Sequence, residues 1–377
     1  MSDVGPGENS ARGFARTAKN PHLCTLQNPD RMLHTEDTRI EALAIHVVGN
    51  RAKDEPLLAS PGLSPQTDDE ALMHTLTAYF LDGFKSEMSY NLYHESDPGC
   101  NEVWNFAGKV FDNPATLYEQ SVNLARHLYA CGTLPQIKGG EFYVVYFSGC
   151  RFGGERVDAL GLFKSETRDT FLDTEAQDDG VHLATRQGID IKRLDKGAVI
   201  FNLERNEGFV VQIVDNTNRS EARYWIDDFL HVRERQDSYH NTHNAMVMCK
   251  RYVTKHLAQE FDVSKADQAE LLNDTMSYFR EQDSFSMEEF SEKVIRQPEV
   301  AESFARFRQQ YEEERDIRIE DCFDISDAAV KRQARTYKSV IKLDRNFHIY
   351  VHGNRNLLEQ GEDEKGKYYK VYYEQEE

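Results

Sequence analysis

The sequence lacks a long apolar segment. Its longest apolar run, Phe142–Phe147, is far shorter than the ~18 residues of a membrane-spanning helix. The first residues, MSDVGPGENSARGFARTAKN, contain no apolar core typical of a secretory signal. The 6 cysteines include no close pair such as Cys-x-x-Cys, which suits a reducing cytosol better than a disulfide framework. We therefore expect a cytoplasmic protein that does not enter a membrane.

Common catalytic signatures are also absent from the sequence. There is no GxxxxGK[ST] phosphate loop, no GxSxG nucleophile elbow and no HExxH zinc motif. The glycine-rich segment Gly149–Gly154 joins two expected strands rather than a strand and a helix, so it is typical of a hairpin turn. No segment predicts a catalytic residue or a cofactor site.

Three weaker candidates have simpler interpretations. His240 and His243 are spaced to share one face of a helix, but no Cys or acidic residue stands at a matching interval for a metal ligand. The acidic run Asp173–Asp179 does not resemble a calcium loop, and we expect a solvated loop there. Cys150 precedes Arg151, but no catalytic partner can be named, so we interpret this thiol as structural. We expect no metal site.

The composition is that of a globular chain with more than one domain. Hydrophobic residues make up 39% of the 377 residues, with 22 glycines in addition, which is enough for a core. The rhythm of the sequence predicts an α+β fold with four parts. These are a flexible arm (1–36), an α+β domain with an antiparallel sheet (37–216), a connector (217–237), and a mainly helical domain with a basic helix and closing short strands (238–377).

Local signals place several elements within these parts. Apolar spacing predicts a strand from about Arg39 and a helix after a capping box at Thr67–Glu70. A second helix should run between Asn113-Pro114 and Gly132. Further expected elements are hairpins at 141–148/156–164 and 199–203/209–214, a helical stretch at 238–259, helices after Ser264, Ser286 and Pro298, a short helix from Ser326, and strands at 339–343, 347–352 and 368–373.

The negative charge is unevenly distributed. The chain has 45 basic and 65 acidic residues and a formal charge of −20. Residues 257–327 carry 8 basic and 20 acidic residues, whereas residues 328–355 carry 7 basic residues and 1 acidic residue. Because charges act within a Debye length of ~8 Å, a phosphate polymer responds to such a local patch rather than to the total.

The basic segment is the one positive signal for function. Its cations are Lys331, Arg332, Arg335, Lys338, Lys342, Arg345 and Arg355. On a helix from Ser326, three of them recur at i, i+4 and i+7 and form one stripe, and Tyr337, Phe347 and Tyr350 lie among them. Clustered flexible cations suit phosphate binding. The alternative is that these cations pair with the acidic helices of 257–327, and charge runs alone slightly favour that alternative.

A set of collinear segments resembles a known family. The segments are Tyr224–Leu230, Ser286–Val294, Arg306–Arg308, Ala328–Arg332, Ile341–Tyr350 and Tyr368–Tyr373. Together they resemble the bacterial nucleoid-associated proteins of the thirty-seven-kilodalton, chromosome-associated kind, in the same order of elements. The resemblance covers roughly residues 38–373 and leaves out the arm.

The resemblance implies nucleoid association, binding to double-stranded DNA and no enzymatic activity. It supplies no fixed pattern of DNA-contacting residues, so the seven cations remain an inference from charge. We expect a homodimer. The alternatives are an acidic adaptor that binds a DNA-processing enzyme or chromosome protein without touching DNA, and a metal-dependent enzyme built on carboxylates of the N-terminal sheet.

Overall fold

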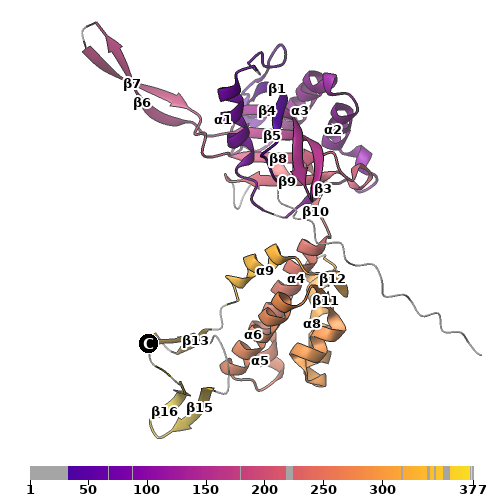
Figure 1. Ribbon diagram of the computed structural model, residues 1–377, viewed down its shortest axis with the longest axis vertical. Helices are drawn as coiled ribbons and strands as arrows, with labels where there is room; N and C mark the ends of the chain where they lie inside the picture. Colours follow the sequence, from indigo (N-terminus) through magenta and orange to yellow (C-terminus); the bar gives the residue numbers. More distant parts are fainter. Residues whose placement is uncertain are drawn as a thin grey trace, which may run out of the picture.

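A computed structural model of the chain describes residues 33–375, apart from residues 67, 87, 179, 218–223, 316, 338–339, 344, 351–356 and 374. Figure 1 shows a sheet with its helices in the upper part of the view and a mainly helical part below it. The predicted α+β fold class is confirmed, including the N-terminal antiparallel sheet and the short strands that follow the helices.

The upper part is built on an antiparallel sheet of eight strands in the order β10-β3-β9-β8-β5-β4-β1-β2. Its elements in chain order are β1 (Arg39–Val48), β2 (Leu57–Ala59), α1 (Glu70–Leu81), β3 (Tyr90–Leu92), α2 (Glu102–Asp112), α3 (Leu117–Cys131), β4 (Gly140–Phe152), β5 (Glu155–Ser165), β6 (Asp169–Gln177), β7 (Gly180–Gly188), β8 (Lys196–Phe201), β9 (Val210–Asp215), a π-helix (Trp225–Leu230) and β10 (Val232–Glu234). Strands β6 and β7 form a separate hairpin that extends away from the sheet (Figure 1).

Helices cover both faces of the sheet because its central strands are apolar on both faces. Successive side chains of a strand point to opposite faces. In β4, Phe142 and Val144 therefore join the core under α2 and α3. Tyr143 and Val145 join the core on the other face, where they pack with Phe80 of α1. A near-continuous apolar strand is the sequence pattern that such a two-sided core requires.

The segments at the expected domain boundaries contact the sheet. Trp225 and Phe229 of the π-helix are buried in the core under α2 and α3, and β10 pairs with β3 at the sheet edge. Residues 1–32 of the expected arm lie outside the described residues, whereas Leu33 is buried and His34 pairs with Arg151. The division into four parts stays a prediction.

The helices of the lower part surround an apolar core of their own. Its elements are α4 (Ser238–Arg251), a π-helix (Tyr252–His256), α5 (Leu257–Glu260), α6 (Lys265–Glu281), β11 (Ser284–Ser286), α7 (Met287–Phe290), a π-helix (Ser291–Ile295), α8 (Pro298–Arg315), β12 (Cys322–Asp324), α9 (Asp327–Ala334), β13 (Val340–Leu343), β14 (Phe347–Tyr350), β15 (Leu358–Asp363) and β16 (Gly366–Val371). Large aromatic residues dominate this core, and the buried Tyr252 contacts both Phe304 and Phe307 of α8.

Three of the predicted helices begin at the serine residues that the sequence indicates as caps. A fourth helix begins at a different cap from the one predicted. Ser264, Ser286 and Ser326 each accept a backbone hydrogen bond at the start of the predicted helix. The helix predicted after Thr67 instead has Asp69 as its cap, whose carboxylate accepts from the backbone of Leu72. Aspartate competes equally well for this position, so the pattern alone could not separate the two.

The interpretation of Asp173–Asp179 as a solvated loop was wrong for most of that run. Residues up to Gln177 belong to β6, which pairs with β7 along its whole length. Acidic residues are poor strand formers, but here they alternate with Thr and Ala and lie on one face of the hairpin. Arg186 forms ion pairs across that face with Asp173 at 2.6 Å and Glu175 at 2.5 Å.

Candidate nucleic-acid interface

Helix α9 packs on α4 through one face and thereby exposes the other. Ser326 caps the helix, and Ala329, Val330 and Gln333 are buried. The amide nitrogen of Gln333 donates to Nδ1 of His243 on α4 at 2.8 Å. Because residues three and four apart share a helix face, burying these three side chains turns the intervening cations outward.

The end of α9 is anchored by an aromatic residue that the sequence interpretation placed among the cations. Tyr337 is buried in the lower core, and its hydroxyl donates to the backbone carbonyl of Met246 in α4. Burial raises its pKa well above the ordinary value, so the hydroxyl keeps its proton. Tyr337 therefore fixes the end of α9 on α4 and is not available to contact a ligand.

Three cations are exposed here: Lys331 and Arg332 in α9, and Arg335 at its C-terminal cap. Arg332 donates to the hydroxyl of Tyr239 at 2.9 Å, which holds its guanidinium at the surface above α4. Lys331 and Arg335 make no ion pair with any residue in the described part of the chain. They are therefore available for an external anion.

The acidic helices do not neutralise this segment among the residues that the structure describes. Among the described residues, six of their carboxylates lie within ion-pair distance of basic side chains of residues 251–308 instead. These pairs are Arg251–Glu314, His256–Glu260, Lys293–Glu289, Arg296–Asp274, Arg306–Glu260, Arg308–Glu312 and Arg308–Asp321. Within the described ranges, no ion pair joins the basic segment to the acidic helices. The alternative, in which these cations pair with those helices, therefore has no ion pair in its support.

Strands β13 and β14 continue the exposed cationic segment beyond α9. In their register, Lys342 faces His348, and Val340 faces Tyr350, so these side chains share one face of the hairpin. The opposite face carries Ile341, which packs with Ala266 and Leu358 in a small separate core.

Lys342 and Arg345 are exposed, and Phe347, beside the turn, is 66% exposed. Lys338 and Arg355 lie outside the described residues. Five of the seven predicted cations can therefore be placed, and all five are exposed. In Figure 1, α9 and β13 both lie on the left side of the lower part.

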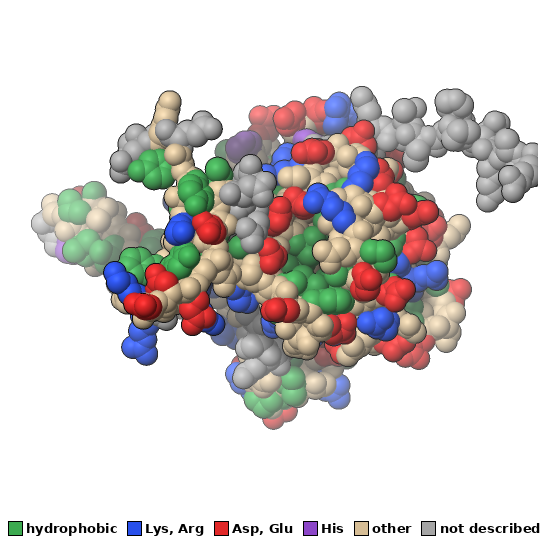
Figure 2. Space-filling view, turned by 90° about the horizontal axis from the view of Figure 1, so that it is seen from below, with side chains coloured by type: hydrophobic (Ala, Val, Ile, Leu, Met, Phe, Trp, Pro, Cys, Tyr) green, Lys and Arg blue, Asp and Glu red, His purple; other side chains and the backbone are tan. Residues whose placement is uncertain are grey.

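The surface around this segment is mixed in charge. Figure 2, which views the molecule from the end occupied by the lower part, shows acidic and basic side chains interspersed rather than one broad basic face. On the side of the molecule that Figure 2 shows, the basic side chains do not merge into one continuous patch. This distribution favours a narrow contact with a phosphate backbone over extensive coating.

The two histidines considered as metal ligands lie beside this segment, at the start of α4. Both help to line a small pocket against Met88, Ser89 and Glu234 at the edge of the sheet. Burial and the nearby guanidinium of Arg332 lower the pKa of His243, so its ring is neutral at pH 7. Within the described ranges, no group of three or more His, Cys, Asp or Glu side chains could hold a metal ion.

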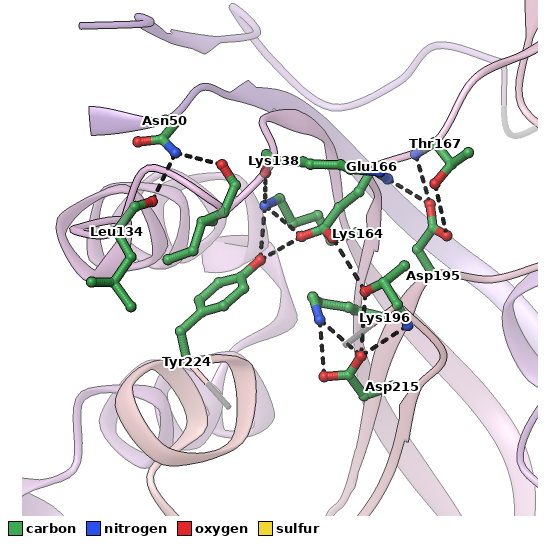
Figure 3. A network of polar contacts seen from close by, with 12 residues as sticks. Asn50, Leu134, Lys138, Lys164, Glu166, Thr167, Asp195, Lys196, Asp215 and Tyr224 are labelled. Carbon is green, nitrogen blue, oxygen red and sulfur yellow. Dashed lines mark hydrogen bonds and ion pairs between the residues drawn. The ribbon is translucent and has the colours of Figure 1, made fainter. Parts of the chain in front are cut away.

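The sequence interpretation missed a buried polar network at the end of the sheet (Figure 3). Lys164 and Lys196 lie opposite each other on β5 and β8, and both are at most 2% exposed. The ammonium of Lys164 donates to Glu166 at 2.9 Å and to the hydroxyl of Tyr224 at 2.9 Å. Lys196 pairs with Asp215 at 2.8 Å.

This network attaches the segment before the π-helix to the sheet. The hydroxyl of Tyr224 donates to Glu166 at 2.6 Å, and its ring lies 5.3 and 5.2 Å from the ammonium groups of Lys164 and Lys196. Burial lowers the pKa of Lys164, with Glu166 opposing the shift. Burial and Glu166 raise the pKa of Tyr224. Since each charge has a close partner, the network is a structural clamp.

Cys150 agrees with its interpretation as a structural residue. Its side chain is buried in the core beside α1, and burial raises its pKa to about 11. The thiol is therefore protonated at neutral pH and is a poor nucleophile.

The fold and the exposed segment together define an α+β protein with exposed cations on α9 and the β13–β14 hairpin. The profile of the family described as nucleoid-associated protein YejK matches residues 44–367. The chain belongs to this family of nucleoid-associated proteins, as its sequence resemblance predicted. The match extends from β1 into β16 and includes α9, β13 and β14.

A search of curated proteins finds no match to the chain. Among the described residues, no helix has the length and apolarity needed to span a membrane.

Proposed function

We propose that the chain is a non-enzymatic DNA-binding protein of the nucleoid, which contacts the phosphate backbone through its basic segment. The contacting residues are Lys331, Arg332, Arg335, Lys338, Lys342, Arg345 and Arg355. The protein acts in the cytoplasm as a homodimer on double-stranded DNA and needs no cofactor. The observation that carries the proposal is the exposure of all five described cations, none of which forms an ion pair with another described residue.

The physical basis is release of counterions from the phosphate backbone. Each neutralised phosphate frees condensed cations, and log K falls against log[salt] with a slope of about −0.9 per contact on duplex DNA. Roughly three to five contacts per chain give a slope near −3 to −4. Because phosphate contacts carry no base information, affinity should be similar on unrelated sequences.

The test is direct binding of the purified full chain to labelled duplexes of two unrelated sequences. We expect retention of both duplexes at low salt, with similar affinity and with loss of binding as salt rises from ~50 to ~200 mM. The chain is expected to bind without any added protein. A strong preference for one sequence would contradict a phosphate-based contact.

A second candidate function is an acidic adaptor that recruits a DNA-processing or chromosome protein. The formal charge of −20 and the mixed surface in Figure 2 favour this candidate, since both oppose a general attraction to DNA. The same titration separates the two functions. Absence of binding to bare duplex, even at low salt, would support the adaptor and contradict direct contact.

A further inference from the structure

The exposed aromatic side chains of the described chain are concentrated near its end. Of the five exposed aromatic side chains among the described residues, four belong to residues 347–373. These four are Phe347, Tyr350, Tyr372 and Tyr373, and the fifth is Phe171 in the β6–β7 hairpin. A single exposed apolar residue is common on any surface, whereas a concentration of such residues is typical of a contact surface.

Phe347 lies at the tip of a hairpin face whose base is already covered. In the β13–β14 register, Phe347 opposes Leu343 beside the turn. Ile341 and Ile349 oppose each other further along the same face. Ile341 is 1% exposed, and Leu343 and Ile349 pack against the small core to which it belongs. The ring of Phe347 extends past that core and is 66% exposed, so the packing of the hairpin does not account for it.

The described charges beside Phe347 are positive. Arg345 lies in the turn, two residues before Phe347, and Lys342 lies next to the cross-strand partner of Phe347. Both cations are exposed. Apart from Asp344, which lies outside the described residues, the hairpin sequence 340–350 contains no acidic residue. An exposed aromatic ring therefore lies among flexible cations, and a ligand for this tip should combine negative charge with a flat apolar surface.

An unpaired nucleotide has both of these properties. Its base offers a flat face on which an aromatic ring can stack, whatever the base, and its phosphate attracts the neighbouring cations. In a continuous duplex each base face is covered by the next base pair, so the ring has no base to stack on. We propose that Phe347 stacks on an unpaired base, and that the basic segment therefore binds most tightly where a single-stranded gap interrupts a duplex. This inference rests on the DNA contact of the proposed function and adds the kind of DNA site.

Titration of the full chain with two DNAs tests this assignment. One is a continuous labelled duplex, and the other is the same duplex with a short single-stranded gap. The parent chain should bind the gapped DNA about 5- to 100-fold more tightly. Phe347→Leu keeps an apolar side chain opposite Leu343 but removes the ring, so it should reduce this preference to within about twofold and leave the affinity for continuous duplex unchanged. Phe347→Trp retains a flat ring and should retain the preference.

Phe171 provides the matched control, because it is a 49% exposed aromatic residue outside the basic segment. Phe171→Leu should leave the preference for gapped DNA unchanged, and K331A/R335A should weaken binding to both DNAs without changing their ratio. A parent chain that binds both DNAs equally would overturn the stacking proposal and leave the proposed duplex contact intact. A preference that F347L retains would also overturn it, because the gap would then act through its flexibility. Absence of binding to either DNA would contradict both the stacking proposal and the proposed function.

Discussion

Replacing Lys331 and Arg335 together by alanine should lower the salt slope of duplex binding by about 2 and weaken binding roughly 10- to 100-fold at ~0.1 M salt. Each side chain is exposed and forms no ion pair among the described residues, so the loss reflects phosphate contacts rather than rearranged partners. The reduction should be the same on unrelated duplex sequences. The measurement is a titration of labelled duplex at several salt concentrations.

The control removes the same charge from a different surface. Lys109 of α2 and Arg126 of α3 are also exposed, and the variant K109A/R126A has the same net charge as K331A/R335A. Its slope should match that of the parent. Thermal unfolding of both variants should be unchanged, since α9 is held by its buried face. An unchanged slope in K331A/R335A would place the DNA contact on another part of the chain.

Removing the carboxylate of Glu166 should destabilise the upper part by about 3–5 kcal/mol. Glu166 is the anionic partner of Lys164, and both side chains are 2% exposed. The Glu166→Ala substitution leaves a buried ammonium without its counter-charge, and it leaves the hydroxyl of Tyr224 without its acceptor. Because domains are typically stable by only 5–15 kcal/mol, chemical denaturation should reveal the loss.

A surface pair provides the comparison for this prediction. Asp274 pairs with Arg296 where the two side chains are 32% and 63% exposed, and Asp274→Ala should cost at most about 1 kcal/mol. The double variant K164M/E166L removes both buried charges and should recover much of the loss. Equal effects of E166A and D274A would show that the buried pair is not important for stability.

The free energy of unfolding depends on pH with a defined sign. Burial lowers the pKa of Lys164 below its ordinary value of 10.5, so the unfolded chain binds more protons than the folded chain between these two pKa values. Stability must therefore rise with pH in that window. The effect should be larger in E166A, because Glu166 opposes the lowering. The deficit of E166A relative to the parent should consequently shrink as the pH rises towards 10.

Much of the fold follows from local signals in the sequence. The strand from Arg39, the β4–β5 and β8–β9 hairpins and the helices after Ser264, Ser286 and Ser326 form as expected. The strands are apolar runs bounded by turn residues, and each of these helices has a side-chain cap at its start. In the β4–β5 hairpin, Gly153 and Gly154 both have positive φ, which is the conformation that a tight two-residue hairpin turn requires.

Charge conceals the pattern of two of the strands that the sequence did not reveal. Strand β6 has acidic residues on one face, and β15 (Leu358–Asp363) contains three acidic residues among six. The amino-acid composition of both strands is therefore similar to that of solvated loops. The buried Lys164 and Lys196 were missed because lysine is almost never fully buried without a partner. Their partners, Glu166 and Asp215, are identified only by the register and by tertiary contacts.

The candidate site was only partly predictable for a related reason. The sequence identified the basic segment but could not decide whether its cations were exposed or paired, because the acidic helices lie close by in the chain. That distinction depends on which face of α9 packs against α4. Tyr337 also could not be recognised as a core residue from its position between Arg335 and Lys338.

Acetylation of lysine side chains with and without duplex DNA tests the central claim most directly. Lys331 and Lys342 are exposed in the basic segment, whereas Lys109 and Lys192 are exposed in the upper part. DNA bound to the basic segment should protect Lys331 and Lys342 from the reagent and leave Lys109 and Lys192 as reactive as before. The claim that DNA binds the basic segment would be contradicted by protection confined to the upper part. It would also be contradicted if no lysine were protected at a DNA concentration that saturates binding.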